Sequence, residues 1–226
     1  MFQIQRRSPG SSAMRILFWW SVIVRMLGWF LIIVYGYRRN GRENIPKSGP
    51  LLIISNHQSH LDSPAIGSLV LDRPFKSIAK EALFSSRLLA YLMKRFGVIS
   101  VNRGESDTAA IRGAISELKN GRSVMLFPEG SRSPDGEIKE FQRGVWMLIR
   151  RGNAMVLPVA VEGTFDIWPL GGKLKLRGKV EAAAGTPIST KDLLQLGEQE
   201  GMALLKSKIE SLRLVCRENI DRRLKK

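Results

Sequence analysis

Both histidines of this 226-residue chain lie in one short stretch, residues 56–62, which reads NHQSHLD. Histidine is the side chain whose ordinary pKa lies closest to neutral pH, so it is the usual general base in catalysis. Asp62 follows His57 by five residues, across an expected turn from a strand to a helix. A carboxylate placed there can orient the imidazole and stabilise its charged form. The stretch therefore predicts a His–Asp pair, and a turn that only caps the following helix is the alternative interpretation.

A second chemistry-bearing stretch, residues 127–132 (FPEGSR), follows an apolar run, and Arg103 follows another. Guanidinium groups bind phosphate through two parallel hydrogen bonds, so Arg103 and Arg132 are candidate phosphate ligands. Ordinary surface ion pairs are the alternative for both arginines. Glu129 is a candidate for positioning an acceptor hydroxyl or an arginine, or for a local salt bridge. Gly130 either lets a ligand approach the backbone closely or only forms a tight turn.

The elements that must position these residues alternate along the chain. Short apolar runs predict strands, and the segments with helical spacing between them predict helices. The predicted strands are residues 51–55, 76–79, 98–101, 123–127 and 155–161, with a strand pair at 174–177 and 180–183, and the predicted helices are residues 63–71, 85–96, 105–119 and 141–151. This alternation is typical of an α/β fold, with a mostly parallel sheet covered by helices on both faces. Active sites in such sheets lie at the carboxyl ends of the strands, which is where both stretches fall.

Residues 14–39 predict a helical segment that anchors the chain to a membrane, after a mobile polar tail at residues 1–13. Residues 16–37 are mostly apolar and aromatic, and about 20 such residues are enough to span a bilayer. Arg25 lies in the middle of this run, where an arginine costs roughly 2.5–3.5 kcal/mol on insertion. Because basic residues flank both ends, we expect an anchor that enters and leaves on the same side. A buried core helix is the alternative.

The chain is strongly basic, with 36 Lys and Arg against 20 Asp and Glu and a net charge of +16. That balance indicates an anionic partner, such as a membrane surface, a nucleic acid or a phosphorylated substrate. After an α/β domain at residues 40–198, residues 199–226 predict a basic amphipathic C-terminal helix. This helix either lies on anionic lipid or packs on the domain with a solvated face. A single cysteine, Cys216, excludes an internal disulfide and a Cys-rich zinc site, and no metal-ligand cluster is visible.

In their order and spacing, these stretches resemble the motifs of the glycerolipid acyltransferase family, specifically its bacterial 1-acyl-sn-glycerol-3-phosphate acyltransferases. The His-x4-Asp motif stands at His57 and Asp62, and the Phe-Pro-Glu-Gly-Ser-Arg motif stands at residues 127–132. The resemblance extends over residues 41–185, and Asn102 stands where many members carry Asp. Three further stretches match the family's less specific motifs: residues 80–83 (KEAL), 97–103 (GVISVNR) and 157–159 (LPV).

The resemblance implies transfer of a fatty acyl group from acyl-ACP or acyl-CoA to the sn-2 hydroxyl of lysophosphatidic acid, which gives phosphatidic acid. His57 would be the general base, oriented by Asp62, and no metal or other cofactor is implied. No Gly-x-Ser-x-Gly elbow is present, so we expect direct transfer without an acyl-Ser59 intermediate. The implied substrate-binding residues are Lys80, Arg103 and Arg132 for the phosphate, with Glu129 and Gly130 at the acceptor.

The implied partners are the two substrates, membrane lipid and an acyl carrier protein, and the implied location is the cytoplasmic face of a bacterial inner membrane. Three other functions stay open at this point. The first is nucleic-acid binding, which the basic charge suggests but which no helix-turn-helix, zinc or RNA-recognition motif supports. The second is acyl transfer to another lysolipid, such as a lyso-ornithine lipid. The third is lipid binding without catalysis.

Overall fold

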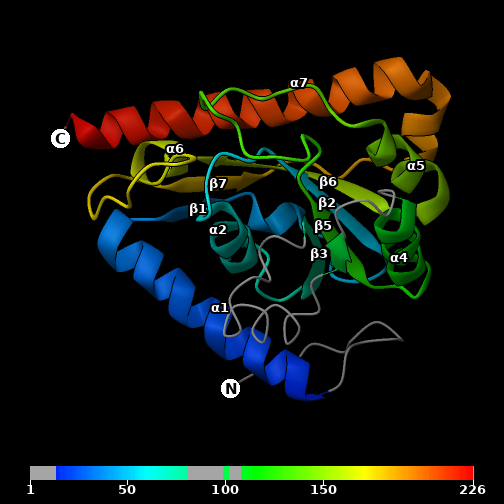
Figure 1. Ribbon diagram of the computed structural model, residues 1–226, viewed down its shortest axis with the longest axis horizontal. Helices are drawn as coiled ribbons and strands as arrows, with labels where there is room; N and C mark the ends of the chain where they lie inside the picture. The colour runs from blue at the N-terminus through cyan, green and yellow to red at the C-terminus, as the bar shows by residue number, and fades with distance from the viewer. Residues whose placement is uncertain (1–13, 81–98, 102–107, 226) are drawn as a thin grey trace.

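The computed structural model describes residues 14–80, 99–101 and 108–225 (Figure 1). In this part of the chain, seven strands form one sheet in the order β1-β7-β6-β2-β5-β3-β4. Every neighbouring pair is parallel except β6 and β7. The strands are β1 (Arg38–Asn40), β2 (Leu51–Ser55), β3 (Phe75–Lys80), β4 (Ile99–Val101), β5 (Ser123–Leu126), β6 (Met155–Glu162) and β7 (Glu181–Ala184).

Helices cover both faces of this sheet. Successive side chains of a strand point to opposite faces, and β2 shows this directly. Leu51 and Ile53 belong to a core shared with α1 and α2, whereas Leu52 and Ile54 belong to a core shared with α4, α5 and α7. The prediction of a mostly parallel α/β sheet with helices on both faces is confirmed. The helices are α1 (Met14–Tyr35), α2 (Asp62–Leu69), α4 (Thr108–Lys119), α5 (Arg143–Gly152), α6 (Thr164–Ile167) and α7 (Thr190–Leu224).

Two details of the sheet differ from the sequence-based prediction. Residues 174–177 form no strand and lie in an exposed loop before β7. β1 was not predicted, because three polar residues have no hydrophobic alternation and become a strand only by pairing with β7. Pro158 lies within β6, which pairs with both β2 and β7. It is tolerated because the ladder with β7 begins one residue later, at Val159. The predicted helix at residues 85–96 lies outside the described residues.

The N-terminal helix α1 packs along the domain instead of standing apart from it. Trp20, Val24, Leu31 and Tyr35 form a buried stripe that faces α2 and the sheet. Gly28 lies where the two helices approach closely, and a side chain there would collide with Ser68 of α2. Much of the apolar surface that predicted a membrane anchor is therefore buried against the rest of the protein. Among the described residues, no helix has the length and hydropathy needed to cross a membrane.

The C-terminal helix α7 also packs on the sheet, over β6 and β7 (Figure 1). It begins at Thr190, nine residues before the predicted start at residue 199, and it bends at Gly197. Its apolar stripe, which includes Leu205 and Ile209, is buried in the core. Several of its basic residues pair with two buried carboxylates of the sheet: Arg213 and Arg217 with Glu162, and Arg223 with Glu181. This arrangement matches the packing alternative, since the apolar stripe faces the domain.

Candidate active site

The central feature of the site is a His–Asp pair at the carboxyl end of β2. The turn after Ser55 carries His57, and α2 begins at Asp62. His57 Nδ1 lies 2.9 Å from Asp62 Oδ2, and the Asp62 side chain is fully buried. Since a carboxylate can only accept, Nδ1 carries the hydrogen, and the other ring nitrogen, Nε2, has a free lone pair. No residue in the described part of the chain bonds to Nε2, and the ring is partly exposed.

Asp62 accepts several hydrogen bonds besides the one from His57. Its Oδ2 atom also accepts the backbone N–H groups of Gln58 and Ser59, both at 2.7 Å. Its Oδ1 atom accepts the hydroxyl of Thr164 at 2.6 Å, across the sheet from the start of α6. Asp62 also stands in the first turn of α2, where the helix dipole favours negative charge. These contacts offset the cost of burying a carboxylate and fix the orientation of His57.

The turn after β5 supports His57 at its ring and at its backbone. The Phe127 ring stacks on the imidazole, with ring centroids 3.7 Å apart and planes inclined by only 8°. The buried Glu129 carboxylate accepts the backbone N–H of His57 at 2.8 Å and that of Lys139 at 3.1 Å. Burial raises the pKa of Glu129, although the two N–H donors act in the opposite direction. In the structure Glu129 therefore holds the backbone of His57 in place through a hydrogen bond, and it forms no salt bridge among the described residues.

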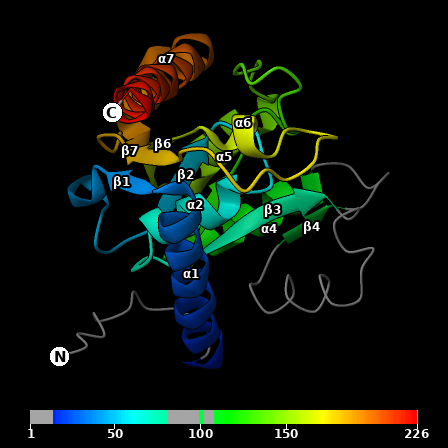
Figure 2. The ribbon, with the colours of Figure 1, turned by 90° about the vertical axis from the view of Figure 1, so that its left-hand side faces the viewer.

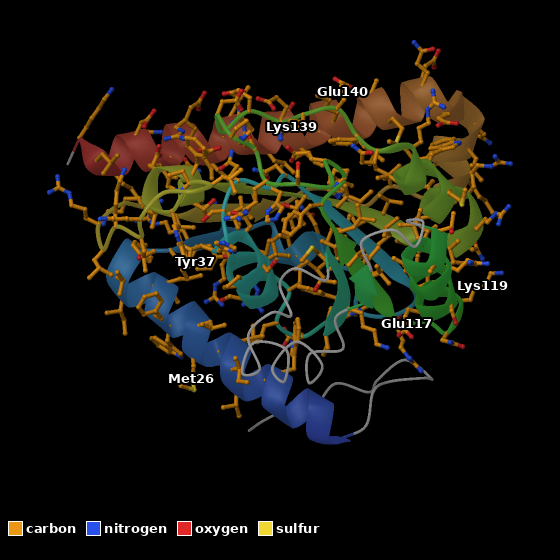
Figure 3. The ribbon with its side chains drawn as sticks, viewed as in Figure 1. Met26, Tyr37, Glu117, Lys119, Lys139 and Glu140 are labelled. Atoms are coloured by element: carbon orange, nitrogen blue, oxygen red, sulfur yellow. The ribbon has the colours of Figure 1, made fainter. Side chains whose placement is uncertain are left out.

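Gly130 and Arg132 occupy the same turn but differ in environment. Gly130 is exposed and has a φ of 70°, a conformation in which glycine is favoured because it lacks a Cβ. Arg132 is partly exposed, and its carbonyl accepts from Lys139 Nζ at 3.1 Å. Lys139 and Glu140 lie on the loop that passes beside α7 (Figure 3), where Glu140 pairs with Lys206. The turn is thus fastened to the following loop, and the guanidinium of Arg132 is left at the surface of the site.

The second histidine, His60, lies beside Trp168. It is exposed, and its ring lies 4.9 Å from that of Trp168, which follows α6. Desolvation lowers the pKa of His60, and the positive charge of Arg132 lowers it further. The Ser59 hydroxyl donates to the Trp168 carbonyl at 2.8 Å and accepts from the Leu61 N–H, so it does not face His57.

The structure brings together His57, Asp62, Glu129, Gly130 and Arg132 from two strand ends. Arg103, and the Lys80 side chain, lie outside what the structure describes. Sequence reasoning missed Thr164 and Trp168 because both follow β6, and only the pairing of β6 with β2 brings them to Asp62 and Ser59. The rule that sites form at strand ends would have pointed to this segment. Among the described residues, no cluster of side chains could hold a metal ion.

A mostly parallel α/β sheet with a His–Asp pair at its strand ends is typical of enzymes in which a base can activate a hydroxyl or water. The family described as Acyltransferase matches residues 37–162, which is more than half of the chain. The chain belongs to this acyltransferase family.

Several relatives are similar over most of the chain. The 1-acyl-sn-glycerol-3-phosphate acyltransferase LPAT1, chloroplastic, of Arabidopsis thaliana is 33% identical over 71% of this chain and 46% of its own length. The 1-acyl-sn-glycerol-3-phosphate acyltransferase of Bacillus subtilis is 27% identical over 75% of this chain and 82% of its own. The chain spans about half the length of the plant relatives it matches.

The fold has a solved counterpart. The crystal structure of the 1-acyl-sn-glycerophosphate (LPA) acyltransferase PlsC from Thermotoga maritima superposes with a TM-score of 0.72 and 29% identity. The match covers 89% of this chain and 78% of that one. The similarity therefore includes most of the sheet and helices described above.

Proposed function

We propose that this protein transfers a fatty acyl group from an acyl thioester to the sn-2 hydroxyl of lysophosphatidic acid, forming phosphatidic acid. The observation that supports this most directly is the 2.9 Å contact between His57 Nδ1 and the buried Asp62 carboxylate. That contact leaves Nε2 available to take a proton from an acceptor hydroxyl. The names of the relatives from Arabidopsis thaliana and Bacillus subtilis support the acceptor.

In this proposal, the acyl group passes directly from the thioester to the acceptor, without an acyl-enzyme. The acceptor hydroxyl oxygen attacks the thioester carbonyl carbon while His57 Nε2 takes the hydroxyl proton, so a C–O bond forms. The tetrahedral intermediate then collapses, the C–S bond breaks, and the imidazolium returns the proton to the leaving thiolate. Asp62 stabilises the imidazolium between these two steps, because its negative charge lies 2.9 Å from Nδ1.

A covalent intermediate on Ser59 is disfavoured by geometry. A serine nucleophile needs a hydrogen bond from its hydroxyl to the base. The Ser59 hydroxyl instead donates to the Trp168 carbonyl at 2.8 Å, and the side chain is buried. We therefore retain direct transfer as part of the proposal, and the absence of an acyl-enzyme by mass spectrometry during turnover is the expected result.

The acceptor's phosphate is proposed to bind the guanidinium of Arg132, which is partly exposed beside the site, together with Arg103 and Lys80. Glu129 is buried, and each of its oxygens accepts a backbone N–H group, so in this proposal it positions His57. Gly130 shapes the same turn through its positive φ.

The proposal also places the enzyme on a membrane, at the cytoplasmic face of a bacterial inner membrane, with acyl-ACP or acyl-CoA as donor. The support is a second apolar stripe on α1, which faces away from the domain and consists of Met26, Trp29, Phe30 and Ile33. Figure 3 shows Met26 pointing away from the rest of the protein. These residues recur at i, i+3, i+4 and i+7, the spacing of one helix face. A helix with one face on the domain and the other apolar suits the membrane interface. We call these four residues the outer stripe.

The test is an acyl-transfer assay in mixed micelles, with wild type and His57→Ala compared. Lysophosphatidic acid is offered with acyl-CoA and with acyl-ACP, and lysophosphatidylcholine and a lyso-ornithine lipid serve as acceptors without a phosphomonoester. Formation of phosphatidic acid that His57→Ala abolishes supports the reaction, the acceptor and the base. Turnover of only the other acceptors would assign the site to a different lysolipid, and equal activity of His57→Ala would reject His57 as the base.

A further inference from the structure

The loop of residues 168–180, between α6 and β7, presents an unusual surface. Leucines and basic residues alternate in it, which is why residues 174–177 were predicted to be a strand. In the structure both kinds of side chain are exposed, and Leu176 is 72% exposed. Single exposed leucines are common in soluble proteins, but several in succession indicate a binding surface. The exposed residues are Leu170, Leu174 and Leu176 and, between and after them, Lys173, Lys175 and Arg177.

One part of this loop lies against the end of α1. The Tyr35 hydroxyl donates to the Lys175 carbonyl at 3.0 Å. The Tyr35 ring in turn meets the Phe30 ring edge-on, with centroids 5.9 Å apart, and Phe30 belongs to the outer stripe of α1. Figure 2 shows α1 and the loop, in yellow, together on the face turned toward the viewer. The loop that carries the exposed leucines therefore meets α1 next to the outer stripe.

The other part of the loop begins at the site. Trp168, its first residue, accepts the Ser59 hydroxyl through its carbonyl and places its ring beside His60. Trp168 directly follows α6, and the Thr164 hydroxyl of that helix binds Asp62. Since the loop starts beside the His–Asp pair and returns past α1, it connects the site with the outer stripe.

We propose that the loop of residues 168–180 is a second membrane contact, which binds an anionic bilayer beside the outer stripe of α1. Its leucines enter the headgroup region, and its basic residues reach the lipid phosphates, because long cationic side chains bury their stems while their charges stay at the polar surface. The two contacts hold the mouth of the site against the surface from which a lysolipid enters. This inference rests on the proposed function, which places α1 on a membrane.

An acidic carrier protein is the other partner that lysines could bind, but the loop fits a bilayer better. Steering an acidic protein requires charge alone. Here three exposed leucines accompany the charges, and the loop meets α1 at Tyr35, whose ring contacts Phe30 of the outer stripe. An apolar surface of this kind, interleaved with basic residues, is complementary to the headgroup boundary of anionic lipid.

The test is binding to vesicles, measured by sedimentation with the full chain, which requires no catalysis. Vesicles of phosphatidylcholine with and without phosphatidylglycerol are compared for two loop variants. Matched controls change the same residue classes at exposed positions of α7, and of α4 and α5 at the other end of the sheet. The apolar loop variant carries Leu174→Ser and Leu176→Ser, and its control carries Leu214→Ser and Val215→Ser. The basic loop variant carries Lys173→Gln, Lys175→Gln and Arg177→Gln. Its control carries Lys119→Gln, Arg150→Gln and Arg151→Gln.

The basic loop variant should lose roughly a hundredfold in its partition coefficient on anionic vesicles, since each basic residue near such a surface contributes about fivefold. The apolar loop variant should lose about tenfold on both kinds of vesicle. Binding of the loop variants that equals wild type, or that falls no further than in the controls, would overturn the inference. So would unchanged vesicle binding with a selective loss of turnover from acyl-ACP, which would assign the loop to the carrier protein.

Activity on two forms of the acceptor separates this inference from the proposed function. Short-chain lysophosphatidic acid is dissolved in water, and the long-chain form is presented in vesicles. The loop variants should keep wild-type turnover of the dissolved acceptor and lose turnover of the vesicle-bound one. If the wild type acylates neither acceptor, the proposed function fails, whereas the vesicle-binding result still decides the role of the loop.

Discussion

Replacing Asp62 by asparagine removes a charge from the site while keeping the shape and most of the hydrogen bonds. The amide oxygen can still accept the N–H groups of Gln58 and Ser59, and the amide nitrogen can donate to the Thr164 hydroxyl. The fold should therefore survive. What is lost is the attraction between the carboxylate and the imidazolium that forms when His57 takes the acceptor's proton.

The size of that attraction follows from the geometry. For two unit charges 2.9 Å apart, Coulomb's law with an effective dielectric constant of about 20 gives about 6 kcal/mol. The dipole of the substituted amide retains a part of this, so a loss of roughly 10³- to 10⁴-fold in kcat is expected for Asp62→Asn. Removal of the orienting carboxylate from a catalytic triad has an effect of about this size.

The assay compares kcat and KM for phosphatidic acid formation, and thermal unfolding verifies the fold. Thr164→Val is the matched control, because it removes one hydrogen bond to Asp62 and keeps the charge. It should destabilise the protein by about 1.5–3 kcal/mol and lower kcat by no more than about tenfold. A folded Asp62→Asn enzyme whose kcat lies within tenfold of wild type would refute the argument, as would equal kcat losses in the two variants.

Three further predictions concern other titratable groups. Glu129→Gln should destabilise the fold by about 1–3 kcal/mol, because an amide accepts only one of the two backbone N–H groups that the carboxylate holds. Burial raises the pKa of Glu129. The contribution of Glu129 to the free energy of unfolding therefore falls as pH rises from 4.5 toward the raised pKa. Denaturant unfolding measured against pH should show this fall in wild type but not in Glu129→Gln. NMR titration should give His60 a pKa below 6.5. Arg132→Gln should raise this pKa by removing a positive charge. An unchanged His60 pKa in Arg132→Gln would show that Arg132 does not act on His60. Cys216 is buried with its pKa raised to about 12, so a thiol reagent at pH 8 should label it only as the protein unfolds, and rapid labelling of native protein would contradict its burial.

The sequence by itself determined the local features of this protein. Continuous apolar runs such as residues 51–55 and 123–126 can only be stable when both faces are covered, so a largely parallel sheet was predictable. His57 and Asp62 are near neighbours in the chain, and one turn suffices to join them. The same holds for residues 127–132, which place Glu129 and Gly130 in one tight turn after a strand.

Only the tertiary structure decided the contacts that join distant segments. The Thr164 hydroxyl reaches Asp62 across 102 residues of sequence, and Glu129 reaches the His57 backbone across 72, because β6 and β5 flank β2 in the sheet. The tertiary structure also decided which apolar side chains are buried and which are exposed. Hydropathy counts the leucines and aromatic residues of α1 and of residues 170–176 alike, but packing buries one stripe of α1 and leaves the outer stripe and the loop exposed. Burial is a property of the neighbours that folding supplies, so no local pattern could have distinguished them.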